Sequence, residues 1–110
     1  MKMILYHNKN CSKSRECLSI LTQKKIDFEV RDYMKENLTL NEVKNLINNL
    51  KSELKEIIRD KKLFNTTKII NKDELSNHLF QNPKNMQRPI FFNGTNYYIC
   101  RPPELVKEFI

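Results

Sequence analysis

The chain of 110 residues is long enough for one domain, residues 1–110, with a single core, and no repeat or low-complexity linker divides it. Its formal net charge is +7, but the basic residues are scattered rather than gathered in one tract, so no nucleic-acid partner is expected. The longest apolar run, Met3 to Tyr6, is too short for a membrane span or a signal sequence, which predicts a cytoplasmic protein without membrane contact.

The first elements expected along the chain are a strand, a helix and a second strand. The apolar run from Met3 to Tyr6 predicts a buried strand. A helix should follow it to about Lys25, because one face carries apolar residues at helical spacing, Cys17, Leu18 and Leu21. Residues Phe28 to Tyr33 predict the second strand, which should run parallel to the first because a helix connects the two.

A block of helices is expected next. Thr39-Leu40-Asn41-Glu42 is a capping box that opens a helix, whose apolar residues are Leu40, Val43, Leu46, Ile47 and Leu50. Ser52 is expected to cap a short helix that ends at Arg59. Asn71 is expected to begin one more helix, which runs to about Gln81.

The sheet resumes late in the chain. Pro89 to Phe92 and Tyr97 to Cys100 flank the turn signal Asn93-Gly94-Thr95-Asn96, so an antiparallel hairpin is expected. Pro102 and Pro103 suit the first turn of a terminal helix. That helix should bury its apolar residues, Leu105, Val106, Phe109 and Ile110.

This order of elements predicts an α/β fold of the thioredoxin-like kind, a mixed four-stranded sheet with an inserted helical block. The thioredoxin-like core should comprise residues of about 1–34 and 86–110. The helical insertion should occupy about 38–82.

Cys11 is the candidate nucleophile, because it stands where the first strand ends and the first helix begins. Unpaired backbone N–H groups and the helix dipole place roughly half a positive charge at a helix N-terminus. Such surroundings depress the pKa of a cysteine thiol and favour the reactive thiolate. Lys9, Lys13 and Arg15 lie nearby in the sequence and act in the same direction.

No second cysteine stands in the position that would resolve a disulfide on Cys11. Thioredoxin-type oxidoreductases carry Cys-x-x-Cys at this turn, whereas here the second position is Ser14, so a thiol from outside the chain is expected to supply electrons. A phosphatase-type anion loop would need arginine six positions after Cys11, where the chain has Cys17. We expect Cys17 and Cys100 to be structural, and a resolving role for Cys100 remains open. No spacing of His, Cys, Asp and Glu resembles a metal site, so none is expected.

Four motifs in order along the chain resemble those of the glutaredoxin-coupled arsenate reductases. The motifs are His7-Asn8-x-x-Cys11-x-x-Ser14-Arg15, then Arg59 after an Ile-Ile pair, Arg88-Pro89 before a strand, and Cys100-Arg101-Pro102 before the last helix. The resemblance spans essentially the whole chain. It implies that Cys11 is the nucleophile and that Arg59, Arg88 and Arg101 hold an oxyanion, with His7, Ser14 and Arg15 in support. Arg31 is the one arginine left for the surface.

The resemblance implies that arsenate is reduced to arsenite with no bound cofactor, glutathione acting as co-substrate thiol and glutaredoxin as partner. Arginine suits such a site, because its planar fork adds geometry to its charge. Two alternatives remain open. Spx-like relatives bind RNA polymerase as transcription regulators and typically carry Cys-x-x-Cys, which Ser14 interrupts here. A glutathione-dependent thiol reductase with another substrate would keep Cys11 in the same role.

Overall fold

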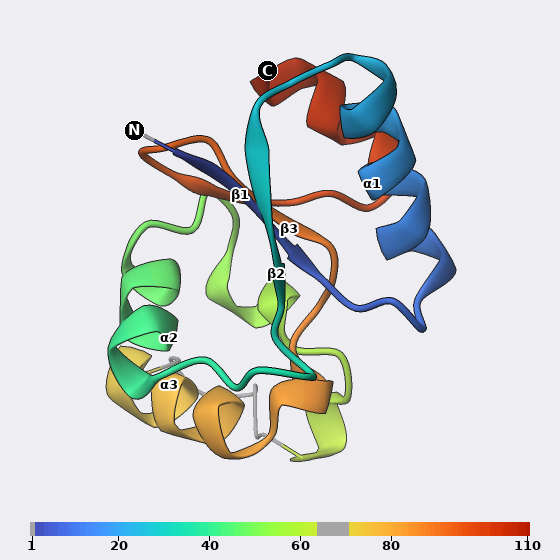
Figure 1. Cartoon of the computed structure of the whole chain (residues 1–110). Coiled ribbons are helices and arrows are strands. Elements are labelled where there is room, and N and C mark those ends of the chain that lie inside the picture. The colour runs from blue at the N-terminus through green and yellow to red at the C-terminus, as the bar shows by residue number, and fades with distance from the viewer. Residues whose placement is uncertain (1, 64–70) are drawn as a thin grey trace.

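The computed structural model describes residues 2–63 and 71–110, and its central feature is a four-stranded sheet with strand order β2-β1-β3-β4 (Figure 1). Strand β1 (Met3–His7) pairs in parallel with β2 (Phe28–Asp32) and antiparallel with β3 (Ile90–Phe92). Strand β4 (Tyr97–Ile99) completes the hairpin with β3. The expected thioredoxin-like mixed sheet is therefore confirmed, and each strand ends within one residue of its predicted bounds.

Two apolar clusters cover the two faces of this sheet. Leu5 points to the face on which α1 (Ser12–Gln23) packs beside a 3-10 helix at Pro103–Phe109 (Figure 1). Tyr6 points to the opposite face, towards the helical insertion. Because successive strand residues alternate between faces, a slip of one residue in β1 would exchange the two clusters.

The insertion between β2 and β3 contains α2 (Leu40–Asn48) and α3 (Lys72–Gln81), which pack against each other. The predicted capping box is confirmed: Thr39 Oγ1 accepts from the Glu42 N–H at 3.1 Å, and Glu42 Oε1 accepts from the Thr39 N–H at 2.8 Å. None of the helices in the described residues is long and apolar enough to cross a membrane.

Two predictions at the ends of elements are wrong. The expected helix after Ser52 is a 3-10 helix at Leu54–Ile57 with extended Glu53 in the N-cap position, so the Ser52 hydroxyl lies against the Glu53 carbonyl and caps no helix. Ile110 is exposed, because it lies beyond the last turn of the terminal helix and outside the surface that packs on the sheet.

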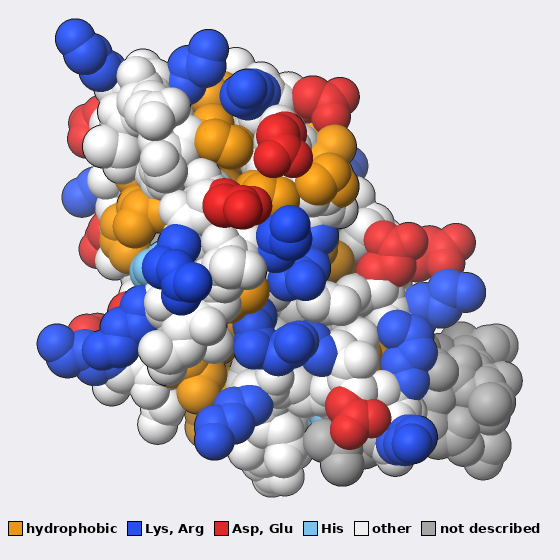
Figure 2. Space-filling model, turned by 90° about the vertical axis from the view of Figure 1, so that its right-hand side faces the viewer, with side chains coloured by type: hydrophobic (Ala, Val, Ile, Leu, Met, Phe, Trp, Pro, Cys, Tyr) orange, Lys and Arg blue, Asp and Glu red, His pale blue; other side chains and the backbone are white. Residues whose placement is uncertain are grey.

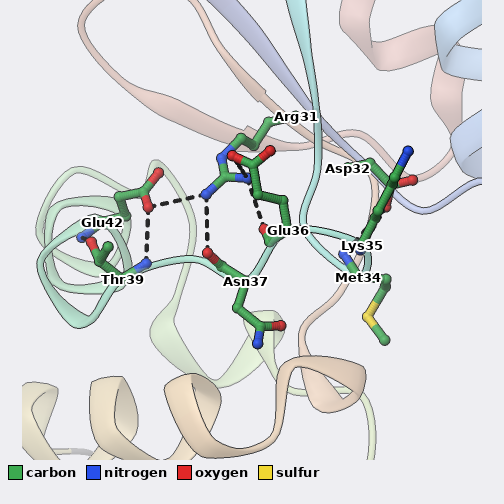
Figure 3. Close-up of polar contacts among 8 residues, drawn as sticks. All are labelled: Arg31, Asp32, Met34, Lys35, Glu36, Asn37, Thr39 and Glu42. Atoms are coloured by element: carbon green, nitrogen blue, oxygen red, sulfur yellow. Dashed lines mark hydrogen bonds and ion pairs between the residues drawn. The ribbon is translucent and has the colours of Figure 1, made fainter.

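The prediction that Arg31 belongs to the surface is also wrong, since only 17% of its side chain is exposed. Its guanidinium donates to the carbonyl oxygens of Glu36 at 2.7 Å and Asn37 at 3.1 Å, and to Glu42 Oε1 at 3.2 Å (Figure 3). Glu42 is at the same time the carboxylate of the capping box. Arg31 thus fixes the segment that leaves β2 to the start of α2.

The middle of the helical insertion meets the segment that leads into β3. Ile58 forms an antiparallel bridge with Met86, and the Arg59 N–H donates to the Asn85 carbonyl at 2.8 Å. Arg59 and Arg88 therefore come from two short segments that are hydrogen bonded to each other, although 29 positions separate them in the sequence.

The turn of the β3-β4 hairpin uses the single glycine of the chain. Gly94 has φ of 103°, a conformation that side chains disfavour. Asn93 Oδ1 accepts from the N–H groups of Thr95 and Asn96, both at 2.9 Å. The peptide bonds that precede Pro89 and Pro102, on either side of this hairpin, are both cis.

Candidate active site around Cys11

Cys11 lies at the N-cap position of α1, as predicted, with extended backbone angles of φ −102° and ψ 122°. Its N–H donates to the Asn8 carbonyl at 3.0 Å, and its own carbonyl accepts from the Arg15 N–H at 3.0 Å. These bonds fix the turn between β1 and α1. The side chain is partly exposed, so its sulfur is open to reaction.

Ser14 stands in the place of a second cysteine and organises the turn from inside. Its hydroxyl is buried, accepts from the Asn8 N–H at 3.0 Å and pairs with His7 Nδ1 at 2.6 Å. Burial lowers the pKa of His7, with the charge of Arg15 acting in the same direction and Asp32 against it. His7 is therefore mainly neutral at neutral pH, and its contact with Ser14 helps to hold the turn before Cys11.

Two arginines from the other end of the chain meet at the thiol. Arg101, which follows β4, places Nη1 3.8 Å from the Cys11 sulfur and donates from the same atom to the Arg88 carbonyl at 2.8 Å. Arg88, which precedes β3, donates from Nη1 to the Lys84 carbonyl at 3.0 Å. The fold thus brings together Cys11, Arg88 and Arg101 from opposite ends of the sequence.

The surroundings of Cys11 favour its thiolate. Burial alone would raise the pKa of the thiol, but the backbone N–H groups of Ser14 and Lys13 and the side chains of Arg88 and Arg101 outweigh it, so the pKa lies below its ordinary value. The N–H groups act as the helix N-terminus was expected to act. Lys13 contributes through its backbone rather than through its charge.

Arg59, the third arginine of the predicted set, is exposed, as Arg101 is. Its charge acts on Tyr33, which is fully buried beside the same site. Burial raises the pKa of the Tyr33 hydroxyl, Arg88 and Arg59 lower it, and the Cys11 thiolate raises it further. Tyr33 therefore lies within the electric field of the three charged groups that form the site.

Residues 6–109 match the model of the ArsC family. The chain belongs to the ArsC family. An arsenate reductase of Haemophilus influenzae is 33% identical to it over 116 residues, covering 100% of both chains. Among solved structures, an arsenate reductase from Vibrio cholerae is 31% identical with a TM-score of 0.86, covering 100% of this chain and 98% of its own. A putative arsenate reductase from Yersinia pestis is 33% identical with a TM-score of 0.82, covering 97% and 99%.

Arg15 of this ArsC family member is exposed and donates from Nη1 to the Lys9 carbonyl at 2.8 Å. Its guanidinium thus braces the turn ahead of Cys11. The predicted supporting residues flank this turn: His7 ends β1, and Ser14 and Arg15 lie in the first turn of α1. Their hydrogen bonds to one another and to residues 8 and 9 hold the turn.

Two residues of the site were not singled out from the sequence. Asn8 is buried, and its Oδ1 accepts from the Asn10 N–H at 3.0 Å, which shapes the turn; its place in the first motif was the available signal. Tyr33 looked like the last apolar residue of a strand. The sequence did hold a signal for Tyr33: it directly follows a strand expected to run parallel to the first. The ends of two parallel strands share one edge of a sheet, so Tyr33 lies at the same edge as the turn of Cys11.

The other two thiols of this ArsC family member have no access to solvent. Cys17 and Cys100 are both 0% exposed, as their predicted structural role requires. A hydrogen bond from Cys17, together with burial, raises the pKa of the Cys100 thiol. The Cys100 thiol also donates to the Tyr98 carbonyl oxygen, with its sulfur at 3.7 Å. Both thiols are therefore enclosed, and the Cys100 thiol is kept protonated.

The face of the molecule that carries α1 shows Lys and Arg side chains across its middle, with acidic side chains above, beside and below them (Figure 2). A cleft of about 390 Å³ opens beside the turn of Cys11, lined by Asn8, Lys9, Asn10, Asp32, Met34 and Lys35. In the part of the chain that the structure describes, no group of three or more His, Cys, Asp and Glu side chains is placed to hold a metal ion. The surroundings suit an anionic ligand.

Proposed function

We propose that this protein reduces arsenate to arsenite, with Cys11 as the nucleophile and electrons from glutathione and glutaredoxin. The observation that carries the proposal is the contact of Arg101 Nη1 with the Cys11 sulfur, beside Arg88, in a member of the ArsC family. The full-length relatives from Haemophilus influenzae and Vibrio cholerae are named arsenate reductases, which supports the same substrate here.

The arginines answer an electrostatic problem. A thiolate that approaches an anion meets repulsion of about 4 kcal/mol per charge pair at 4 Å and an effective dielectric constant near 20. Arg88 and Arg101 stand beside the sulfur and offset that repulsion, and Arg59 adds positive charge from the segment bonded to Asn85. Planar guanidinium groups also orient the oxyanion, so that arsenic faces the sulfur.

The reaction balances with thiols from outside the chain. The Cys11 thiolate attacks arsenic, an As–S bond forms, an As–O bond breaks and the leaving hydroxyl takes a proton from solvent and departs as water. The glutathione thiolate then attacks the Cys11 sulfur, so that the As–S bond breaks, its electron pair stays on arsenic and arsenite leaves. Glutaredoxin attacks the glutathione sulfur of the resulting mixed disulfide, which returns the Cys11 thiolate and leaves a disulfide between glutathione and glutaredoxin. The enclosure of Cys17 and Cys100 supports this external supply, because neither thiol is exposed to reach Cys11.

The test is arsenate-dependent turnover with glutathione and glutaredoxin. The variant Cys11→Ser should lose all measurable turnover and keep its fold, because serine is a favoured N-cap residue. The matched control Cys17→Ala should retain turnover. Omission of glutaredoxin should stop the wild-type reaction. Equal turnover in Cys11→Ser and wild type would refute the proposal. Turnover with a disulfide substrate but not with arsenate would instead assign a glutathione-dependent thiol reductase.

The arginines can be tested in the same assay. Arg88→Ala and Arg101→Ala should each raise the arsenate concentration for half-maximal rate by roughly tenfold or more, because each removes a hydrogen bond donor with full charge. Arg59→Ala should have a smaller effect, since Arg88 and Arg101 lower the pKa of the Cys11 thiol directly, whereas the charge of Arg59 acts on Tyr33. Lys24→Ala, an exposed residue at the far end of α1, is the matched control for loss of one positive charge.

A further inference from the structure

Two buried polar atoms at this site have no hydrogen-bond partner. They are the hydroxyl oxygen of Tyr33 and Nε of Arg88, and no others are found among the buried side-chain atoms of the described residues. Buried polar groups are almost always paired in folded proteins, because an unpaired one costs stability. Such a pair of exceptions at one site therefore needs an explanation.

Both atoms lie at the edge of the sheet where Cys11 stands. His7 of β1 pairs with Asp32 of β2, so the chain leaves these parallel strands side by side, towards Cys11 from one and Tyr33 from the other. In open α/β sheets this carboxyl edge is where ligands bind. Arg88 is the strongest charged influence on the Tyr33 hydroxyl, and the Cys11 thiolate also acts on it.

The chemistry of the two unpaired atoms is that of donors without an acceptor. Nε of arginine can only donate. Burial keeps the pKa of Tyr33 above its ordinary value, so the hydroxyl holds its proton and can donate as well. The Asn8 side chain lies near this hydroxyl and lowers its pKa, but their contact falls short of hydrogen-bond geometry and leaves the hydroxyl without a partner. What is missing between the two donors is an oxygen with negative charge.

We propose that Tyr33 is a substrate-binding residue, whose hydroxyl donates, together with Nε–H of Arg88, to one oxygen of the tetrahedral oxyanion that Cys11 attacks. The identity of this anion as arsenate rests on the proposed function, whereas the need for an anionic oxygen rests on the two unpaired donors. Because both donor atoms are buried, the oxygen reaches them only when a side chain on the Cys11 side moves; exposed Arg101 is held there by Nη1 alone, to the Arg88 carbonyl and the sulfur.

The variant Tyr33→Phe removes one hydroxyl and keeps the buried ring. Without ligand, its melting temperature should equal or exceed that of the wild type, because an unpaired buried hydroxyl is removed. At the same time, the arsenate concentration that half protects Cys11 from alkylation should rise by roughly tenfold. A purely structural tyrosine predicts the reverse on both counts: lower stability and unchanged protection.

The matched control is Tyr97→Phe. The Tyr97 hydroxyl accepts from Asn45 Nδ2 at 2.7 Å, away from Cys11, so this variant should lose stability and keep the wild-type protection by arsenate. A parallel series with inorganic phosphate as the probe asks whether any tetrahedral oxyanion is held in the same way.

The outcomes separate this inference from the proposed function. Wild-type turnover of arsenate with a half-saturating concentration unaltered in Tyr33→Phe would overturn the role of Tyr33 and leave the function standing. Absence of arsenate turnover, with phosphate protection that weakens in Tyr33→Phe, would support Tyr33 and remove the function. A wild-type protein that neither anion protects and that turns over no arsenate would overturn both.

Discussion

The three cysteines of this chain stand in two regions with opposite chemistry. Cys11 is partly exposed and faces hydrogen-bond donors, the N–H groups at the start of α1 and two arginines, which lower the pKa of its thiol. Cys17 and Cys100 lie in the core between α1 and the sheet, where burial and their mutual hydrogen bond raise the pKa of Cys100. Reactivity in this protein is therefore decided by what surrounds a sulfur, and only one thiol is surrounded by donors.

The two regions also differ in how completely their side chains are packed and hydrogen bonded. In the core around Cys17, apolar side chains fill the space between α1 and the sheet. At the Cys11 edge, two polar atoms remain unpaired and Arg101 makes its bonds through one atom. The core thus contributes stability, whereas the two unpaired atoms at the edge cost stability.

The largest expected effect that tests this contrast is selective alkylation. At neutral pH, iodoacetamide should label Cys11 alone, with Cys17 and Cys100 slower by a factor of roughly a thousand or more, because their exposure requires unfolding. Mass spectrometry of the intact protein measures the number of labels. Denaturant should restore three labels, and Cys11→Ser in native buffer should take up none. Early labelling of Cys100 would break the contrast.

The second prediction concerns the stability that the enclosed thiols contribute. Cys17→Ser should lower the free energy of unfolding by about 1–3 kcal/mol, because serine is more polar and its hydroxyl is buried among apolar groups. The rate of Cys11 alkylation should stay within twofold of the wild-type rate. Urea unfolding followed by circular dichroism measures the first quantity. A stable Cys17→Ser variant with a slow Cys11 would show that the regions are coupled.

The smallest effect is expected from the pH dependence of Cys11. Its pKa is lowered, so the thiolate persists to lower pH than for an ordinary thiol and alkylation slows as the pH falls through that pKa. Arg101→Ala should shift this profile to higher pH and slow alkylation at pH 7 several-fold. Arg101→Lys, which keeps the charge, should lie between the two. An identical profile in all three proteins would remove Arg101 from the causes of the shift.

Much of the fold could be predicted because its signals are local. The apolar run before Cys11, the capping box at Thr39 and the turn around Gly94 each specify their own segment, and all three form as expected. Ser52 misled because a serine before apolar residues resembles a cap, whereas the following 3-10 helix begins after Glu53.

The candidate site could be predicted only in part. Cys11 was found because its position at a strand-to-helix junction is a local property, and Arg88 and Arg101 through the resemblance of their motifs. Tyr33 was missed, because whether a tyrosine hydroxyl is paired depends on contacts that only the folded chain makes. Arg31 was misplaced for the same reason: besides the Glu42 carboxylate it bonds two backbone carbonyls, which carry no sequence signature.

The contact of Arg101 with Cys11 joins residues 90 positions apart, and it has a consequence for the time during synthesis at which the thiol becomes reactive. The chain emerges from the ribosome N-terminus first. Once α1 begins to form, Cys11 has its local N–H donors, but Arg88 and Arg101 arrive only when the last hairpin docks on β1. A nascent chain thus carries a sulfur that is closer to an ordinary thiol, and its full reactivity marks the moment when folding is complete.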